Sequence, residues 1–114
     1  AEGAYRRALV AHPAHVPLMC NLGLLLYARK VPREHDQAQK LFEKALSVQP
    51  DHTDSLCNLA TLKMEFGDGS QAMEMLDRAL AVDPGKVQAL CSMGVLLETR
   101  AQQLYRDLPE EETI

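Results

Sequence analysis

Aromatic side chains are scarce in this sequence: they make up 4% of its 114 residues, and tryptophan is absent. Leucine and alanine dominate instead, and both favour helices that pack closely. No apolar run approaches the roughly 18–20 residues that a membrane span needs. The basic pair Arg6-Arg7 has no apolar segment behind it, so the start does not resemble a signal peptide. We therefore expect a helical protein that does not insert into a membrane.

The chain also lacks an excess of positive charge. It has 12 basic and 16 acidic residues, a formal net charge of −4 and a pI near 5.5. Because nucleic acids and anionic membranes attract basic surfaces, this balance predicts no nucleic-acid partner. The three cysteines are an odd number, which excludes a fully paired disulfide framework. We expect reduced thiols in an intracellular, cytoplasmic protein.

Catalytic and metal-binding motifs are missing as well. The turn at residues 67–69 lacks the Lys-Ser/Thr that completes a phosphate-binding loop, and there is no G-x-S-x-G element. The three cysteines form no CxxC pair, so small buried fillers are favoured over metal or redox ligands. The histidines are expected to be exposed loop residues: His12, His15, His35 and His52. We therefore expect no enzymatic activity, no cofactor and no bound metal.

What the chain does contain is an internal repeat. Pro13, Pro50 and Pro84 close similar segments at spacings of 37 and 34 residues. The same two spacings relate several further sets: Tyr5, Phe42 and Leu76; Ala8, Ala45 and Ala79; Cys20, Cys57 and Cys91; Leu22, Leu59 and Met93; Gly23, Ala60 and Gly94. The three extra residues of the first complete unit fall between its two helices, in a loop predicted at residues 29–35.

Each unit is predicted to be a pair of helices. Apolar residues recur at helical spacing in both halves of a unit, and residues 66–70 form a clear break between them. In that break, a glycine, Gly67 or Gly69, is expected in the left-handed region and Asp68 or Ser70 as a cap. Small residues such as Gly23 let the two helices approach closely. Because so short a unit cannot bury its apolar face alone, the units must stack.

These residues resemble the tetratricopeptide repeat family. The matching positions are Leu22-Gly23, Ala38, Phe42, Ala45 and Pro50 in one unit, and Leu59-Ala60, Ala72, Leu76, Ala79 and Pro84 in the next. The segment Asp54–Ala60 is also similar to repeats of the O-linked N-acetylglucosamine transferases. The resemblance implies an all-α, right-handed superhelix of antiparallel hairpins with about six helices. It also implies that the first helices line a concave wall where a partner binds.

The repeat predicts how the chain is organised. The array covers residues 1–109, divided into a half repeat at 1–13, repeats at 16–50 and 53–84, and an atypical closing unit at 87–108. The leading half unit is expected of a piece of a longer array. Because no breaker follows Glu98, one long last helix is predicted over 87–107, and a regular short hairpin is the alternative. Residues 110–114 are expected to be frayed.

The resemblance also implies which residues face the partner. The predicted peptide-binding residues of the concave wall are Asn21, Leu24, Tyr27, Asn58, Thr61, Met64, Ser92 and Val95. The same wall is expected to carry ten further residues: Pro17, Cys20, Ala28, Asp54, Cys57, Glu65, Gln88, Cys91, Glu98 and Thr99. The amides of Asn21 and Asn58 offer a donor and an acceptor, which suits a peptide backbone. The alternative is that these amides brace or cap neighbouring helices.

Three functions are compatible with this pattern. The first is a protein-interaction scaffold that binds a protein or peptide. The second is the recognition arm of a larger enzyme such as a glycosyltransferase, and the third is self-association through exposed ends. Binding of acidic chaperone tails is excluded, because such a clamp needs fixed positive charge and this wall holds Cys20, Leu24, Cys91 and Val95 at the places where related repeats carry it.

Overall fold

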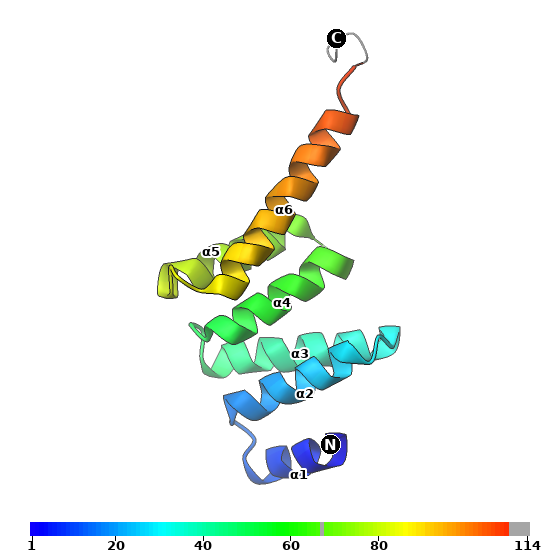
Figure 1. Ribbon diagram of the computed structural model, residues 1–114. Helices are drawn as coiled ribbons and strands as arrows, with labels where there is room; N and C mark the ends of the chain where they lie inside the picture. The colour runs from blue at the N-terminus through cyan, green and yellow to red at the C-terminus, as the bar shows by residue number, and fades with distance from the viewer. Residues whose placement is uncertain (67, 110–114) are drawn as a thin grey trace.

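The computed structural model describes residues 1–66 and 68–109, and these fold into six helices. The helices are α1 (Glu2–Ala11), α2 (Val16–Ala28), α3 (Pro32–Val48), α4 (Thr53–Phe66), α5 (Gly69–Val82) and α6 (Val87–Arg106). They stack as successive hairpins along one axis (Figure 1). The radius of gyration is 16.6 Å, whereas a compact domain of this size has about 13 Å. The predicted all-α stack of about six helices is therefore confirmed.

Side-chain caps fix where several helices begin. Nδ1 of His15 accepts from the backbone N–H of Leu18 at 3.3 Å, and Nδ1 of His52 accepts from that of Ser55 at 3.2 Å. Asp68 accepts from the first turn of α5, as expected. The prediction that His35 and His52 are exposed loop residues is wrong, because both are half-buried: His35 lies within α3, and His52 caps α4. The left-handed backbone expected in this break is not found at Gly69, which begins α5, and Gly67 lies outside the described residues.

The three extra residues lengthen a helix rather than a loop. The connection between α2 and α3 is only residues 29–31, and Pro32 to His35, expected in the loop, form the first turn of α3. Consequently α3 has 17 residues and α5 has 14. Pro32 begins the helix because its missing N–H needs no partner there. Lys30 has a φ of 59°, and this left-handed residue tightens the connection.

The core is built where small residues of one helix receive large residues of the next. A Cβ placed on Gly23 would lie 2.6 Å from Cε1 of Phe42, so the ring of α3 rests directly on α2. Ala38 and Ala45 are fully buried beside Phe42, and Ala72 and Ala79 are buried at the matching places of α5. The central helix α4 is buried at every residue from Ser55 to Ala60. The predicted close approach of paired helices is thus present.

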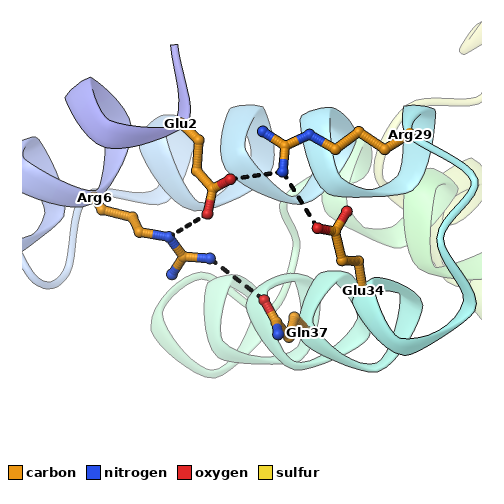
Figure 2. A network of polar contacts seen from close by, with 5 residues as sticks. All are labelled: Glu2, Arg6, Arg29, Glu34 and Gln37. Atoms are coloured by element: carbon orange, nitrogen blue, oxygen red, sulfur yellow. Dashed lines mark hydrogen bonds and ion pairs between the residues drawn. The ribbon is translucent and has the colours of Figure 1, made fainter.

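Helix α1 is joined to the stack by polar contacts as well as by packing. Glu2 pairs with Arg6 at 2.7 Å and with Arg29 at 2.6 Å, and Arg29 also reaches Glu34 at 3.3 Å (Figure 2). Nη2 of Arg6 donates to Gln37 at 3.3 Å. No residue of α1 is fully buried, although Tyr5 and Leu9 pack partly against the core. One carboxylate, that of Glu2, therefore links α1 to the end of α2.

Helix α6 is the single long closing helix that the sequence predicts. Its buried residues are Ala89 and Leu96, and its second half projects beyond the stack (Figure 1). A Cβ on Gly94 would meet nothing within 4 Å, in contrast to the equivalent Gly23. The tail expected to be frayed, 110–114, lies outside the described residues. None of the helices described is long and apolar enough to cross a membrane.

Candidate functional site

Two connected hollows lie along the face formed by the first helices α2, α4 and α6, and we call them together the α2–α4–α6 groove. The smaller hollow has a volume of about 160 Å³ and is lined by Leu24, Tyr27, Phe42, Asn58, Thr61 and Gln88. The larger, of about 400 Å³, is lined by Thr61, Met64, Glu65, Cys91, Ser92, Val95 and Thr99. Thr61 borders both hollows. An elongated partner segment could therefore contact both at once.

The structure brings together most of the residues that the sequence placed on this wall. Of the predicted peptide-binding residues, only Asn21 lines neither hollow, although its side chain is exposed on α2. Phe42 is the lining residue that sequence reasoning missed. It belongs to α3, and its ring reaches the groove because Gly23 of α2 has no side chain in the way. The glycine at position 23 was the signal that could have located it.

The two amides at the centre of the groove are joined to each other. Nε2 of Gln88 donates to Oδ1 of Asn58 at 3.1 Å, which links α6 to α4. Asn58 is only 8% exposed. It therefore braces neighbouring helices, which was the alternative for this residue. Each amide has a second polar atom, Nδ2 of Asn58 and Oε1 of Gln88, so the pair still carries one donor and one acceptor group at the smaller hollow.

A phenol and a carboxylate meet where the two hollows join. The Tyr27 hydroxyl donates to Oε1 of Glu65, which connects α2 to α4. Burial, and then the Glu65 carboxylate, raise the pKa of Tyr27 to about 12, because both disfavour the phenolate. The Lys30 ammonium lies 4.3 Å from the centre of the Tyr27 ring. At neutral pH the phenol is consequently a fixed donor and Glu65 an acceptor.

Two threonine hydroxyls in the groove are satisfied within their own helices. Oγ1 of Thr61 donates to the Cys57 carbonyl at 3.0 Å, and Oγ1 of Thr99 donates to the Val95 carbonyl at 2.9 Å. A hydroxyl has a single proton to donate, so both donors are used internally. What these hydroxyls still offer to a ligand is an acceptor oxygen.

The end of the groove near the start of α4 carries an ion pair. Nζ of Lys86 lies 2.5 Å from Oδ1 of Asp54. The hydrogen bond to Asp54 raises the pKa of Lys86. This cation is therefore already paired within the protein.

A buried cluster of Cys20, Ser55 and His52 lies beneath the α2–α4 contact. Sγ of Cys20 is 2.8 Å from Oγ of Ser55, and Nδ1 of His52 is 2.7 Å from the same oxygen. These are residue types that form nucleophilic sites, but Ser55 has no exposed surface for a substrate to reach. Burial raises the pKa of the Cys20 thiol, which disfavours the reactive thiolate. The cluster is a packing element.

The other two thiols are separate from one another. Cys57 is buried, and its pKa is raised by that burial, whereas Cys91 is exposed in the groove. All three cysteines are free. In the part of the chain that the structure describes, no three histidine, cysteine or acidic residues are grouped as metal ligands would be.

Stacked helical hairpins, in which a small residue of one helix packs against an aromatic ring of the next, define the class of this fold. Comparison with known families identifies the family. The tetratricopeptide repeat model matches residues 33–93, more than half of the 114 residues. The chain therefore belongs to the tetratricopeptide repeat family. No curated protein matches the chain.

Solved structures agree on the fold. A crystal structure of MamA has a TM-score of 0.74 and 19% identity, and the match covers 88% of this chain and 57% of that one. A second, of the MamA protein, has a TM-score of 0.74, 20% identity and coverages of 88% and 53%. This chain thus spans little more than half of either protein, and at this identity the likeness is one of fold. Neither match supports the resemblance to O-linked N-acetylglucosamine transferases.

Proposed function

We propose that this chain is a protein-interaction scaffold that holds a segment of a partner protein in the α2–α4–α6 groove and catalyses no reaction. The observation that carries the proposal is that residues selected from the repeat pattern also line two hollows that share Thr61. The family is generally one of interaction modules, which supports the same function.

The proposed mechanism divides the groove into polar and apolar contacts. The second donor and acceptor of the Asn58–Gln88 pair would bind one peptide unit of the partner backbone. Leu24, Met64 and Val95 would bury apolar side chains of the segment. Asn21, exposed on α2, would supply a further hydrogen bond at the edge of the groove. Each neutral hydrogen bond is worth about 0.5–1.5 kcal/mol net, so apolar burial must provide much of the affinity.

Peptides selected from a random display library test this function with a matched pair of variants. Leu24 is 43% exposed in the groove, and Val48 is 46% exposed at the end of α3 and lines neither hollow. Leu24→Glu should raise the Kd of a selected peptide at least about tenfold, equivalent to 1.4 kcal/mol. Val48→Glu should leave the Kd unchanged. Equal effects of the two variants, with helicity intact in both, would place binding elsewhere.

A second candidate function is self-association, and one observation on α6 favours it. Leu90, Leu97 and Leu104 recur every seven residues and are 50%, 51% and 70% exposed. Gly94 and Ala101 lie between them at the same spacing, and both are exposed. An apolar stripe of period seven is typical of helices that pair in coiled coils. The proposed contact is therefore α6 against α6 of a second copy.

Light scattering over a concentration series tests this second candidate. The apparent mass should rise above 12.7 kDa as concentration increases, and the double variant Leu97→Glu/Leu104→Glu should remain at the monomer mass. Val48→Glu serves again as the control and should associate like the unmodified chain. A mass that stays monomeric at every concentration rejects the α6 contact.

A further inference from the structure

We propose that the larger hollow of the α2–α4–α6 groove receives a lysine or arginine side chain of the bound segment, so that the partner is a basic and apolar peptide. This inference rests on the proposed scaffold function and specifies the chemistry of its ligand. The first reason is charge. Glu65 is the single charged residue among those that line the hollow. Glu98 is exposed on α6, one turn after the lining residue Val95, and adds a second negative charge there.

The second reason is the balance of donors and acceptors. The hydroxyls of Thr61 and Thr99 donate to carbonyls of their own helices, and the Tyr27 hydroxyl donates to Glu65. These groups leave acceptor oxygens for a ligand, and Glu65 adds a carboxylate. An ammonium or guanidinium group has three or five N–H donors and no acceptor, so it complements such a site.

The third reason is the apolar wall beside the carboxylate. Met64 and Val95 line the hollow together with Thr61 and Thr99, whose hydroxyls are turned to their own backbones. Lysine and arginine carry aliphatic stems that pack on apolar surface while the charged group reaches a polar one. The hollow, of about 400 Å³, is large enough for such a side chain.

The fourth reason is that two lysines near the groove make contacts with residues other than Glu65. Lys86 pairs with Asp54, and Lys30 lies over the Tyr27 ring. Within residues 1–66 and 68–109, Glu65 forms no ion pair with a lysine or arginine. The carboxylate can therefore accept a cation from a partner, whereas an acidic side chain would be repelled.

A selection followed by a thermodynamic cycle tests the inference. Peptides that bind the unmodified 114-residue chain and lose binding in Leu24→Gln, which removes the apolar contact without adding a charge, should be enriched in lysine or arginine beside apolar residues. Replacing that basic residue with norleucine, which keeps the stem and removes the charge, should raise the Kd at least about tenfold. In Glu65→Gln the two peptides should differ by less than about threefold, because the partner of the charge is gone. Glu74→Gln, an exposed carboxylate on α5, should keep the full difference.

The outcomes distinguish failure of this inference from failure of the proposed scaffold function. Groove-dependent peptides without basic enrichment, or with acidic enrichment, would overturn the inference and leave the scaffold function standing. An undiminished preference for lysine in Glu65→Gln would also overturn it. If no selected peptide depends on Leu24, the scaffold function and the inference fail together. Circular dichroism of Glu65→Gln shows whether a loss reflects the missing charge or a disturbed fold.

Discussion

Gly23 and Gly94 occupy the same position in the repeat, but Gly23 is crowded and Gly94 is not. At Gly23 the ring of Phe42 lies where a Cβ would be, while the space at Gly94 is empty to 4 Å. Phe42 is 1% exposed, so a Cβ at position 23 would have to displace a ring that is packed on nearly all sides. The same residue type is thus required by packing at one position and tolerated at the other.

Replacing each glycine by alanine should shift stability in opposite directions. Alanine is better than glycine in a helix by about 0.8–1.0 kcal/mol, and Gly94→Ala should gain about that amount. Gly23→Ala gains the same term and loses about 1–3 kcal/mol to overpacking against Phe42, so we expect net destabilisation. Urea unfolding followed by circular dichroism measures both. A stabilised Gly23→Ala variant would mean that the α2–α3 contact is looser than described.

At the scale of the element, α1 is joined to the stack by a network of charged side chains. Arg6, and then Arg29, hold the pKa of the Glu2 carboxyl below its ordinary value of 4.5. Because the folded pKa is depressed, the stabilisation is complete above pH 4.5 and is lost as pH falls through the folded value. The charged side chains of Glu2, Arg6 and Arg29 are at least 30% exposed, and salt will screen them.

We therefore expect α1 to loosen in acid before the rest of the stack. Protection factors from hydrogen exchange should fall in α1 as pH drops below 4.5, while those of α4 hold. Glu2→Gln should lower protection in α1 already at neutral pH and remove most of its acid dependence. An unchanged acid response in Glu2→Gln would assign the effect to another carboxyl group, and α4 supplies the internal control.

At the scale of the whole molecule, repetition explains what could be predicted from the sequence. Residues that recur at 37 and 34 residues predicted the hairpins and the small residues of the helix contacts, and the absence of a breaker after Glu98 predicted the long α6. These features depend on local pattern and nearest-neighbour packing, and in a repeat the same pattern occurs several times in the sequence. The division into units and the roles of the groove residues remain predictions.

Features that occur once were harder to predict. The three extra residues could be located, but not their incorporation into α3, because helix or loop depends on how Pro32 and Lys30 turn the backbone. The capping role of His52 was missed because histidine is not among the usual capping residues. The ring of Phe42 reaches the groove through the gap at Gly23, which is a property of three helices together.

Each helix packs against helices no more than two places away in the chain, which has a mechanical consequence. Helices more than two places apart make no packing contact in the described part of the chain, which measures 63 Å along its longest axis. A tension applied along that axis passes through the interfaces in series, so the weakest interface yields first and the others stay intact. Helix α4, in contact with α2, α3, α5 and α6, would separate last. The stack should thus extend in steps from its ends, and the groove residues of α4 should be among the last to lose their packing contacts.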